Sequence, residues 1–365
     1  MAIMMTPNPP LGVVFHWLGG LAAGSFYVPF RKVKHWAWET LWLAGGIFSW
    51  IIAPLLFAVL LTHGLAAAVR ETPGNTLFWV YFFGVLWGFG GLTFGLTMRY
   101  LGMSLGMAVV MGLCAAFGTL IPPAFKGEFA SRVLGTHSGL VILLGIGVCL
   151  VGITFAGIAG MSKEKEMSAR QKTEAIREFN FKRGLMVAIF SGVMSACFSF
   201  GLDAGDPISK LAIAHGTAAL WQGLPKLVVI LWGGFTTNFL WCVALNIRNR
   251  TGYQYFTAQV RGDSPDRSAE RAPLLRNYLL CALAGTAWYM QFFFYTMGEA
   301  QMGSYKFSSW TLQMASIIIF SSLWGIALHE WRGVSRRTRT LLAVSLALLV
   351  TSTVIVGYGN YLVAR

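Results

Sequence analysis

Apolar residues gather into long runs along nearly the whole chain of 365 residues, and short polar connections separate these runs. A helix needs about 20 apolar residues to cross a hydrocarbon core of roughly 30 Å. The runs reach that length and show none of the period-two alternation of an outer-membrane barrel. They therefore predict ten membrane-spanning helices, at residues 11-30, 40-62, 77-97, 101-123, 138-160, 184-205, 224-247, 277-298, 306-328 and 341-362.

The composition agrees with a membrane protein. Hydrophobic residues make up 56% of the chain and charged residues only 12%, whereas soluble domains carry roughly 25% charged residues. The class predicted is an all-α membrane protein. The first apolar run lacks the basic segment and cleavage site of a signal peptide, so it is expected to remain as the first helix.

The cysteines give no sign of a disulfide framework or a metal site. All five lie inside apolar runs without CxxC or Cys/His spacing, and an isolated cysteine in such a run behaves as a small buried hydrophobe. Neither a metal nor a cofactor is expected. The five are Cys114, Cys149, Cys197, Cys242 and Cys281.

The net charge of +14 comes from basic residues that lie between the apolar runs. Most of them fall in the connections after the first, third, fifth, seventh and ninth predicted helices. Cytoplasmic loops carry the excess of Lys and Arg, so these connections are expected in the cytoplasm and both termini in the periplasm. Basic residues beside a bilayer face anionic lipid, so nucleic acid is not an expected partner.

A charged segment, 161-183, divides the chain into two parts. We expect it to be a cytoplasmic linker between a first five-helix repeat at 1-160 and a second at 184-365. Because five is odd, the second repeat must enter the membrane in the opposite sense, which is the geometry of an inverted repeat in transporters. The segment 248-276 is the other long basic connection, and it is expected to be solvated.

Faint internal similarity supports the two repeats. GVVFHWLGGLAAGSF in the first predicted helix aligns without gaps with GLMVAIFSGVMSACF in the sixth. Three identities are weak in so biased a composition, but their place at the start of each half favours duplication. The matched pairs are Gly12 with Gly184, Gly20 with Gly192 and Phe26 with Phe198.

Three ionisable residues are candidates for proton coupling. Such groups are costly inside a membrane, so their presence suggests a function. His16 could take up protons because imidazole titrates near neutrality, or it could be a neutral side chain bonded to a backbone carbonyl. Asp203 lies within the sixth predicted helix or at its hydrated end beside Asp206. Glu39 opens the second predicted helix, where a salt bridge to the preceding basic cluster is favoured over proton transfer.

Neutral polar and aromatic residues within the helices predict a binding site for an uncharged polyol. Amides can hydrogen-bond hydroxyl groups without carrying charge, and the C–H face of a sugar can stack on an aromatic ring. For each aromatic residue, core packing or an interfacial belt is the simpler alternative. The candidates are Asn238, Gln291 and Gln313, with Trp17, Tyr27, Trp87, Trp288, Tyr289 and Trp310.

Three stretches resemble a known family. FHWLGGLAAGSFYVPFRKVKHWAWET, GLTMRYLGMSLG and WYMQFFFYTMGEA closely resemble the L-rhamnose/proton symporter family of the drug/metabolite transporter superfamily, and the likeness runs from about residue 12 to 360. The resemblance implies import of L-rhamnose with a proton across a bacterial inner membrane, by an inverted five-plus-five arrangement. The matching polar positions are His16, Tyr27, Glu39, Thr97, Arg99, Tyr100, Asn238, Trp288, Tyr289, Gln291 and Trp310.

The chain departs from the family's pattern at four positions. Gly91 and Leu92 stand where polar residues are expected, Asp203 where an amide is expected, and Gln313 in place of a histidine. These positions lie in helices that could line the pocket. The identity of the sugar and of the proton carrier therefore stays open.

The leading hypothesis is a secondary active transporter that imports L-rhamnose, or a closely related deoxysugar, with a proton by alternating access. One alternative is a proton-coupled exporter or exchanger of an amphipathic metabolite or drug, with Asp203 as the partner of a cation. A less favoured one is a membrane sensor that binds a cytoplasmic partner through 248-276. An enzyme is not expected, because no hydrolase elbow, HExxH motif, P-loop or paired catalytic carboxylate is found.

Overall fold

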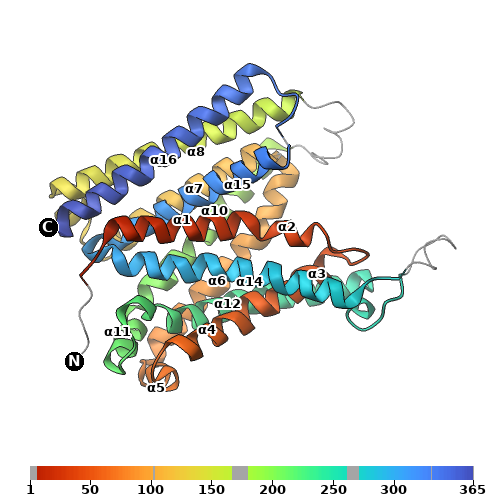
Figure 1. The fold of residues 1–365 in the computed structure, drawn as a ribbon, viewed down its shortest axis with the longest axis horizontal. Coiled ribbons are helices and arrows are strands. Elements are labelled where there is room, and N and C mark those ends of the chain that lie inside the picture. Colours follow the sequence, from red (N-terminus) through yellow and green to blue (C-terminus); the bar gives the residue numbers. More distant parts are fainter. Residues whose placement is uncertain (1–5, 102, 167–179, 261–270, 330, 365) are drawn as a thin grey trace.

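A computed structural model describes residues 6–101, 103–166, 180–260, 271–329 and 331–364. Every regular element within these ranges is helical, and one isolated bridge joins Gln259 to Arg271. Most of the long helices run in the same general direction in Figure 1, and both chain ends lie at the same end of the bundle. We call this the termini end, and the opposite one, where α8 (His137–Glu166) ends and α10 (Phe181–Ala204) begins, the loop end. The predicted class of membrane α-helical protein is confirmed.

In the described part of the chain, nine segments are long and apolar enough to cross a membrane. Each overlaps one of the ten predicted ranges. The nine segments are Pro9–Phe30, Trp38–Leu61, Gly74–Thr97, Gly106–Phe125, His137–Glu166, Lys182–Ala214, Ala219–Asn249, Tyr305–Ala327 and Arg336–Leu362.

The remaining predicted range, 277-298, is helical but does not qualify as a span on the same measure. It forms α14, Leu274–Gln301. Its mean hydropathy is lowered by Gln291 and by the neighbouring Trp288 and Tyr289. The count of ten spans is therefore not confirmed, although α14 packs within the bundle against α1 and α3.

The elements before the charged segment include three that the hydrophobic pattern did not predict, a short helix α5 and two π-helical turns, of which one lies in the second span. Their bounds are α1 Pro9–Ser25, α2 Tyr27–Phe30, α3 Trp38–Ile47, α4 Ala53–Leu61, α5 Leu65–Glu71, α6 Gly74–Leu101, α7 Met103–Phe125 and α8 His137–Glu166, with π-helical turns at Phe48–Ile52 and Phe129–Leu134.

The elements after it also include an unpredicted short helix, α11. Their bounds are α10 Phe181–Ala204, α11 Asp206–Ala214, α12 Leu224–Asn249, α14 Leu274–Gln301, α15 Ser309–Ala327 and α16 Arg336–Ala364, with 3-10 turns η3 Ala219–Trp221, η4 Gly252–Tyr255 and η5 Gly303–Ser308.

The π-helical turn between α3 and α4 has a local cause in the sequence. Pro54 has no backbone N–H to donate, so it interrupts the regular helical ladder. The N–H of Ala53 donates to the carbonyl of Phe48, five residues back, which is the spacing of a π turn. The second span thereby continues from Trp38 to Leu61 with a local change of winding.

Close helix contacts depend on glycine. A Cβ added to Gly84 in α6 would lie 2.1 Å from the carbonyl oxygen of Ile230 in α12. A Cβ added to Gly20 in α1 would lie 2.4 Å from the Cβ of Ser316 in α15. Small residues let helix backbones approach within the membrane, where dispersion replaces the hydrophobic effect as the driving force.

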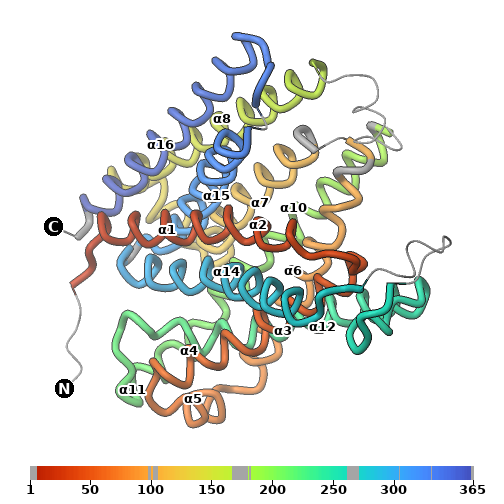
Figure 2. The backbone as a smooth tube through the Cα atoms, turned by 45° about the vertical axis from the view of Figure 1, so that its right-hand side comes forward, coloured from red at the N-terminus to blue at the C-terminus, as the bar shows by residue number. Residues whose placement is uncertain are grey.

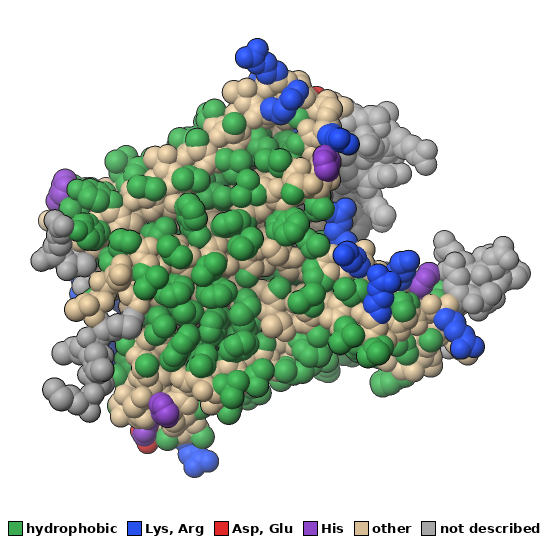
Figure 3. Space-filling view, in the orientation of Figure 1, with side chains coloured by type: hydrophobic (Ala, Val, Ile, Leu, Met, Phe, Trp, Pro, Cys, Tyr) green, Lys and Arg blue, Asp and Glu red, His purple; other side chains and the backbone are tan. Residues whose placement is uncertain are grey.

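The outer surface fits a lipid environment. In Figure 3, hydrophobic side chains cover the middle of the visible face, and most of the visible Lys and Arg side chains gather toward the loop end. Large apolar side chains such as Leu60 and Leu279 are more than 60% exposed. A contiguous apolar surface of this kind is rare on soluble monomers and expected against lipid.

Candidate functional site

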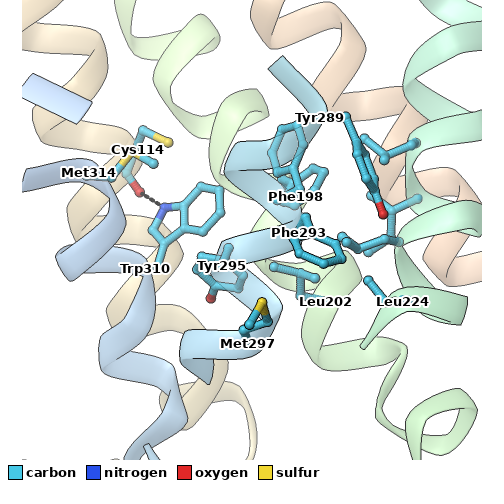
Figure 4. Close-up of a cluster of buried hydrophobic side chains, with 14 of the residues drawn as sticks. Cys114, Phe198, Leu202, Leu224, Tyr289, Phe293, Tyr295, Met297, Trp310 and Met314 are labelled. Carbon is cyan, nitrogen blue, oxygen red and sulfur yellow. Dashed lines mark hydrogen bonds between the residues drawn. The ribbon is translucent and has the colours of Figure 1, made fainter. Parts of the chain in front are cut away.

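A row of buried rings crosses the middle of the bundle from α1 to α15 and α10. The imidazole of His16 meets the ring of Tyr295 edge-on, with centroids 5.2 Å apart. Tyr295 lies 5.8 Å from Trp310, which stacks on Phe198 at 5.9 Å. Figure 4 shows the last three side chains, from α14, α15 and α10, facing one another.

The same row continues to α6 and back to α14. Phe198 stacks on Phe292 at 4.4 Å, and Trp87 meets both rings edge-on, at 4.9 and 5.6 Å. The structure thus brings three candidates predicted from the sequence, His16, Trp87 and Trp310, into one contact group. We call this group the central cluster, and it consists of His16, Trp87, Phe198, Phe292, Tyr295 and Trp310.

Polar atoms without partners border the central cluster. His16 is fully buried, and Gln291 and Gln313 are each 3% exposed. Both ring nitrogens of His16, both side-chain polar atoms of Gln313 and the amide nitrogen of Gln291 make no hydrogen bond to a described residue. An unsatisfied buried polar group costs about 1–3 kcal/mol, so these atoms are candidates for contacts with a polar ligand.

Glycine brings Gln313 and Gln291 against α1. A Cβ on Gly19 would lie 2.9 Å from the side-chain oxygen of Gln313 and 3.0 Å from the carbonyl oxygen of Gln291. A Cβ on Gly298 would lie 2.7 Å from Nε2 of His16. The absence of side chains at these two positions therefore allows the polar groups of three helices to meet.

The indole N–H groups of Trp310 and Trp288 differ in their hydrogen bonding. The indole N–H of Trp310 donates to the carbonyl of Cys114 at 3.0 Å, which sets the plane of the ring (Figure 4). Trp288 packs on Phe26 with centroids 4.3 Å apart, and its indole nitrogen has no partner among the described residues. Trp288 therefore keeps a hydrogen-bond donor available beside the central cluster.

Four other binding candidates lie outside the central cluster. Asn238 is already engaged, since it accepts from Trp42 at 3.0 Å and donates to the carbonyl of Gly234 at 2.8 Å. Tyr289 lies on another face of α14, stacked on Phe57. Tyr27 is half exposed, and Trp17 packs edge-on against Phe320.

Glu39 lies at the loop end, in a network of neutral polar groups. The residue is 5% exposed, and its carboxylate accepts hydrogen bonds from Asn249 at 3.0 Å and from Thr251 at 2.7 Å. The neighbouring hydroxyl of Thr40 donates to Gln254 at 2.9 Å. These bonds tie the start of α3 to the end of α12 and to η4.

Tyr255 extends this loop-end network outside the spans. Burial raises the pKa of Tyr255 to about 12, so its hydroxyl stays protonated at physiological pH. The hydroxyl accepts a hydrogen bond from Asn246 at 3.1 Å, and that of Tyr278 donates to the Tyr255 carbonyl at 2.7 Å. The loop end is therefore held together by hydrogen bonds that do not depend on the protonation of Tyr255 changing near neutrality.

The side chain of Arg99, another position that matches the family, lies outside the described residues.

At the termini end, charged side chains form what we call the ion-pair network. Asp203, in the last turn of α10, pairs with Lys126 at 2.5 Å. Lys226 bridges Glu299 at 2.9 Å and Asp206 at 3.5 Å. The network consists of Lys126, Lys226, Lys306, Asp203, Asp206 and Glu299, and Lys306 pairs with Asp206.

The sequence analysis missed most of this network. Lys226 falls at the very start of the predicted helix 224-247, and the structure places it in the first turn of α12 with its side chain only 3% exposed. Its partner Glu299 is 73 residues away in the chain. The signal available was the lone lysine in GLPKLVV and the lone glutamate in YTMGEA, each at the edge of an apolar run.

Comparison with known proteins decides the family. The family model described as L-rhamnose-proton symport protein matches residues 5–361 of the chain. The chain belongs to this family. An L-rhamnose-proton symporter of Cronobacter sakazakii is 39% identical over 352 residues, which cover 96% of this chain and 97% of the relative. L-rhamnose-proton symporters of Klebsiella pneumoniae and Shigella dysenteriae are each 38% identical with the same coverage.

Membership in the L-rhamnose-proton symport protein family confirms the resemblance read from the three stretches. The family is one of transporters, so the chain is a multi-pass membrane transporter and not an enzyme. Nearly the whole chain is covered, and this includes α1, α10, α14 and α15, which supply most of the central cluster.

Proposed function

We propose that this transporter imports L-rhamnose, or a closely related deoxysugar, together with a proton across the bacterial inner membrane. The observation that carries the proposal is the central cluster in a chain of this family. Rings from α6, α10, α14 and α15 are the groups on which the C–H face of a sugar would stack once they move apart. Gln291, Gln313 and the indole N–H of Trp288 offer uncharged hydrogen-bonding groups for its hydroxyls.

His16 is the proton carrier that the geometry favours. It is the basic side chain of the central cluster, and neither of its ring nitrogens has a hydrogen-bond partner among the described residues. Asp203 is held by Lys126 at the termini end, and Glu39 is hydrogen-bonded at the loop end. A proton on His16 would lie beside the sugar, so its binding would be coupled to that of the substrate.

The packing of the helices supports an inverted repeat of five plus five helices. In the first half α1 packs on α14 and α15, and in the second half α10 packs on α6 and α7, while α8 lies along α16 (Figures 1 and 2). If the two halves are exchanged, α1 takes the place of α10, α14 that of α6, and α15 that of α7. The contacts of α1 then become those of α10. The transporters with such repeats hold their substrate between them and expose it alternately to the two sides.

The glycines that match between the halves make equivalent contacts. A Cβ on Gly12 would meet residues near the end of α14, and a Cβ on Gly184 would meet residues at the end of α6. Likewise, Gly20 faces α15 and Gly192 faces α7. This supports alternating access by the movement of one repeat against the other.

The excess of basic residues at the loop end supports the proposed orientation, with that end in the cytoplasm and both termini in the periplasm. The exporter alternative is supported less, because the carboxylate of Asp203 is paired with Lys126 and lies outside the central cluster. The sensor alternative rests on the connection at 248-276, of which residues 261–270 lie outside the described part.

Uptake into proteoliposomes tests the substrate. With an imposed pH gradient, acidic outside, we expect labelled L-rhamnose to accumulate and unlabelled L-rhamnose to compete at least ten times better than D-glucose. Dissipating the gradient with a protonophore should reduce accumulation to equilibrium. Accumulation of a cationic dye in inside-out vesicles, with no competition by any deoxysugar, would favour the exporter.

A further inference from the structure

We propose that the ion-pair network is the gate that closes the central cluster toward the termini end, with Lys226 as its central residue. This inference rests on the proposed function and adds to it a named gate on the side from which substrate enters. The side chain of Lys226 is 3% exposed, yet it carries a charge, and among the described residues Asp206 and Glu299 are the carboxylates that balance it at close range. Burial of a lysine is tolerated when it is paired in this way.

The network joins elements from both proposed repeats at one point. Lys126 follows α7, Asp203 ends α10, and Asp206 begins α11. Lys226 lies at the start of α12, and Glu299 lies in the last turn of α14. Lys306, in η5, adds the connection between α14 and α15. Each ion pair therefore joins different elements, and separating these elements requires that the pairs break.

The network lies directly beside the central cluster. Glu299 is four residues after Tyr295 in α14, so the two side chains lie on the same face of that helix. The ring of Tyr295 contacts both His16 and Trp310. Opening the network would therefore uncover the side of the cluster where His16 lies.

A pair at the same end offers a matched control. His215 and Glu71 join α11 to α5 at 2.9 Å, but their side chains are 30% and 54% exposed. This pair belongs to the two short helices at the termini end, and neither residue is a member of the ion-pair network. Exposed pairs contribute little to stability, so its loss should leave the gate closed.

Cys114 provides a reporter that requires no transport. It is 3% exposed, and its carbonyl accepts the hydrogen bond from Trp310. We would treat right-side-out and inside-out membrane vesicles with a membrane-impermeant maleimide and measure modification of Cys114 by peptide mass mapping. The variants are Lys226→Met with Glu299→Gln, which removes both charges of the closest buried pair, the conservative Lys226→Arg, and the control Glu71→Gln.

In right-side-out vesicles, we expect the double variant to raise the modification rate of Cys114 at least tenfold, and Lys226→Arg and Glu71→Gln to leave it within twofold. Equal rates in the double variant and Glu71→Gln would overturn the gate. Equal acceleration in both kinds of vesicle would also overturn it, because the whole bundle would then have loosened. Because labelling needs no sugar, failure of the parent protein to accumulate L-rhamnose would overturn the proposed function alone.

Discussion

Replacing His16 with Asn should lower the initial rate of proton-driven L-rhamnose uptake by about 100-fold, which corresponds to a rise of about 2.7 kcal/mol in the activation free energy of uptake. Asn cannot bind a proton near neutrality, but it is small enough to fit against Gly298, on which the imidazole now packs. The measurement is the initial rate of uptake into proteoliposomes with the outside acidic. Exchange of labelled for unlabelled L-rhamnose at equal pH should be less affected, since exchange needs no net proton movement.

Asp203→Asn is the matched comparison, because it also replaces an ionisable group with an amide. Asp203 pairs with Lys126, whose side chain is 39% exposed, so this pair should contribute little to the stability of the protein. We expect sugar-driven proton movement to be retained in this variant, although the loss of one pair from the ion-pair network can change the rate of uptake. If Asp203→Asn abolished sugar-driven proton movement while His16→Asn retained it, the carrier would be Asp203 and the assignment to His16 would be wrong.

Replacing Gly84 with Val should prevent the protein from folding in the membrane. A Cβ at this position would lie 2.1 Å from the carbonyl oxygen of Ile230, and backbone atoms cannot move aside as the end of a side chain can. Overpacking costs typically 1–3 kcal/mol and more where the backbone must shift. The measurement is the yield of monodisperse protein after extraction in mild detergent.

The control for this prediction is Gly95→Val in the same helix. A Cβ on Gly95 meets nothing within 4 Å, so the substitution adds a side chain where space is available. We expect a yield close to that of the parent protein. Equal yields of both variants would show that α6 and α12 are not packed as closely as the structure has them.

The spans could be predicted because each is an apolar run long enough to cross a bilayer, and hydropathy alone carries that signal. The short helices α5 and α11 could not, since they form at the termini end and contain charged residues such as Arg70 and Lys210. The π turn at Phe48–Ile52 also lies within an unbroken apolar run, where only Pro54 hinted at it. The tenth span stays a prediction because the polar residues of α14 lower its hydropathy.

The candidate site could be predicted only in part. The cost of burying ionisable and amide groups singled out His16, Gln291 and Gln313, which the structure places around α1, α14 and α15. Which of the many aromatic residues join them depends on contacts between distant segments, such as Trp87 with Phe292, and no local pattern encodes these. The same holds for Lys226 and Glu299, each of which looked like an ordinary residue at a helix end.

The most direct test of the central claim is the external pH of a weakly buffered suspension of de-energised cells that express this protein. Addition of L-rhamnose should make the medium alkaline, and cells with His16→Asn should show no such change. L-fucose and D-glucose, added in the same way, show how narrowly the site selects its sugar. No alkalinisation with any deoxysugar, with the protein verified in the membrane, would contradict proton-coupled sugar import.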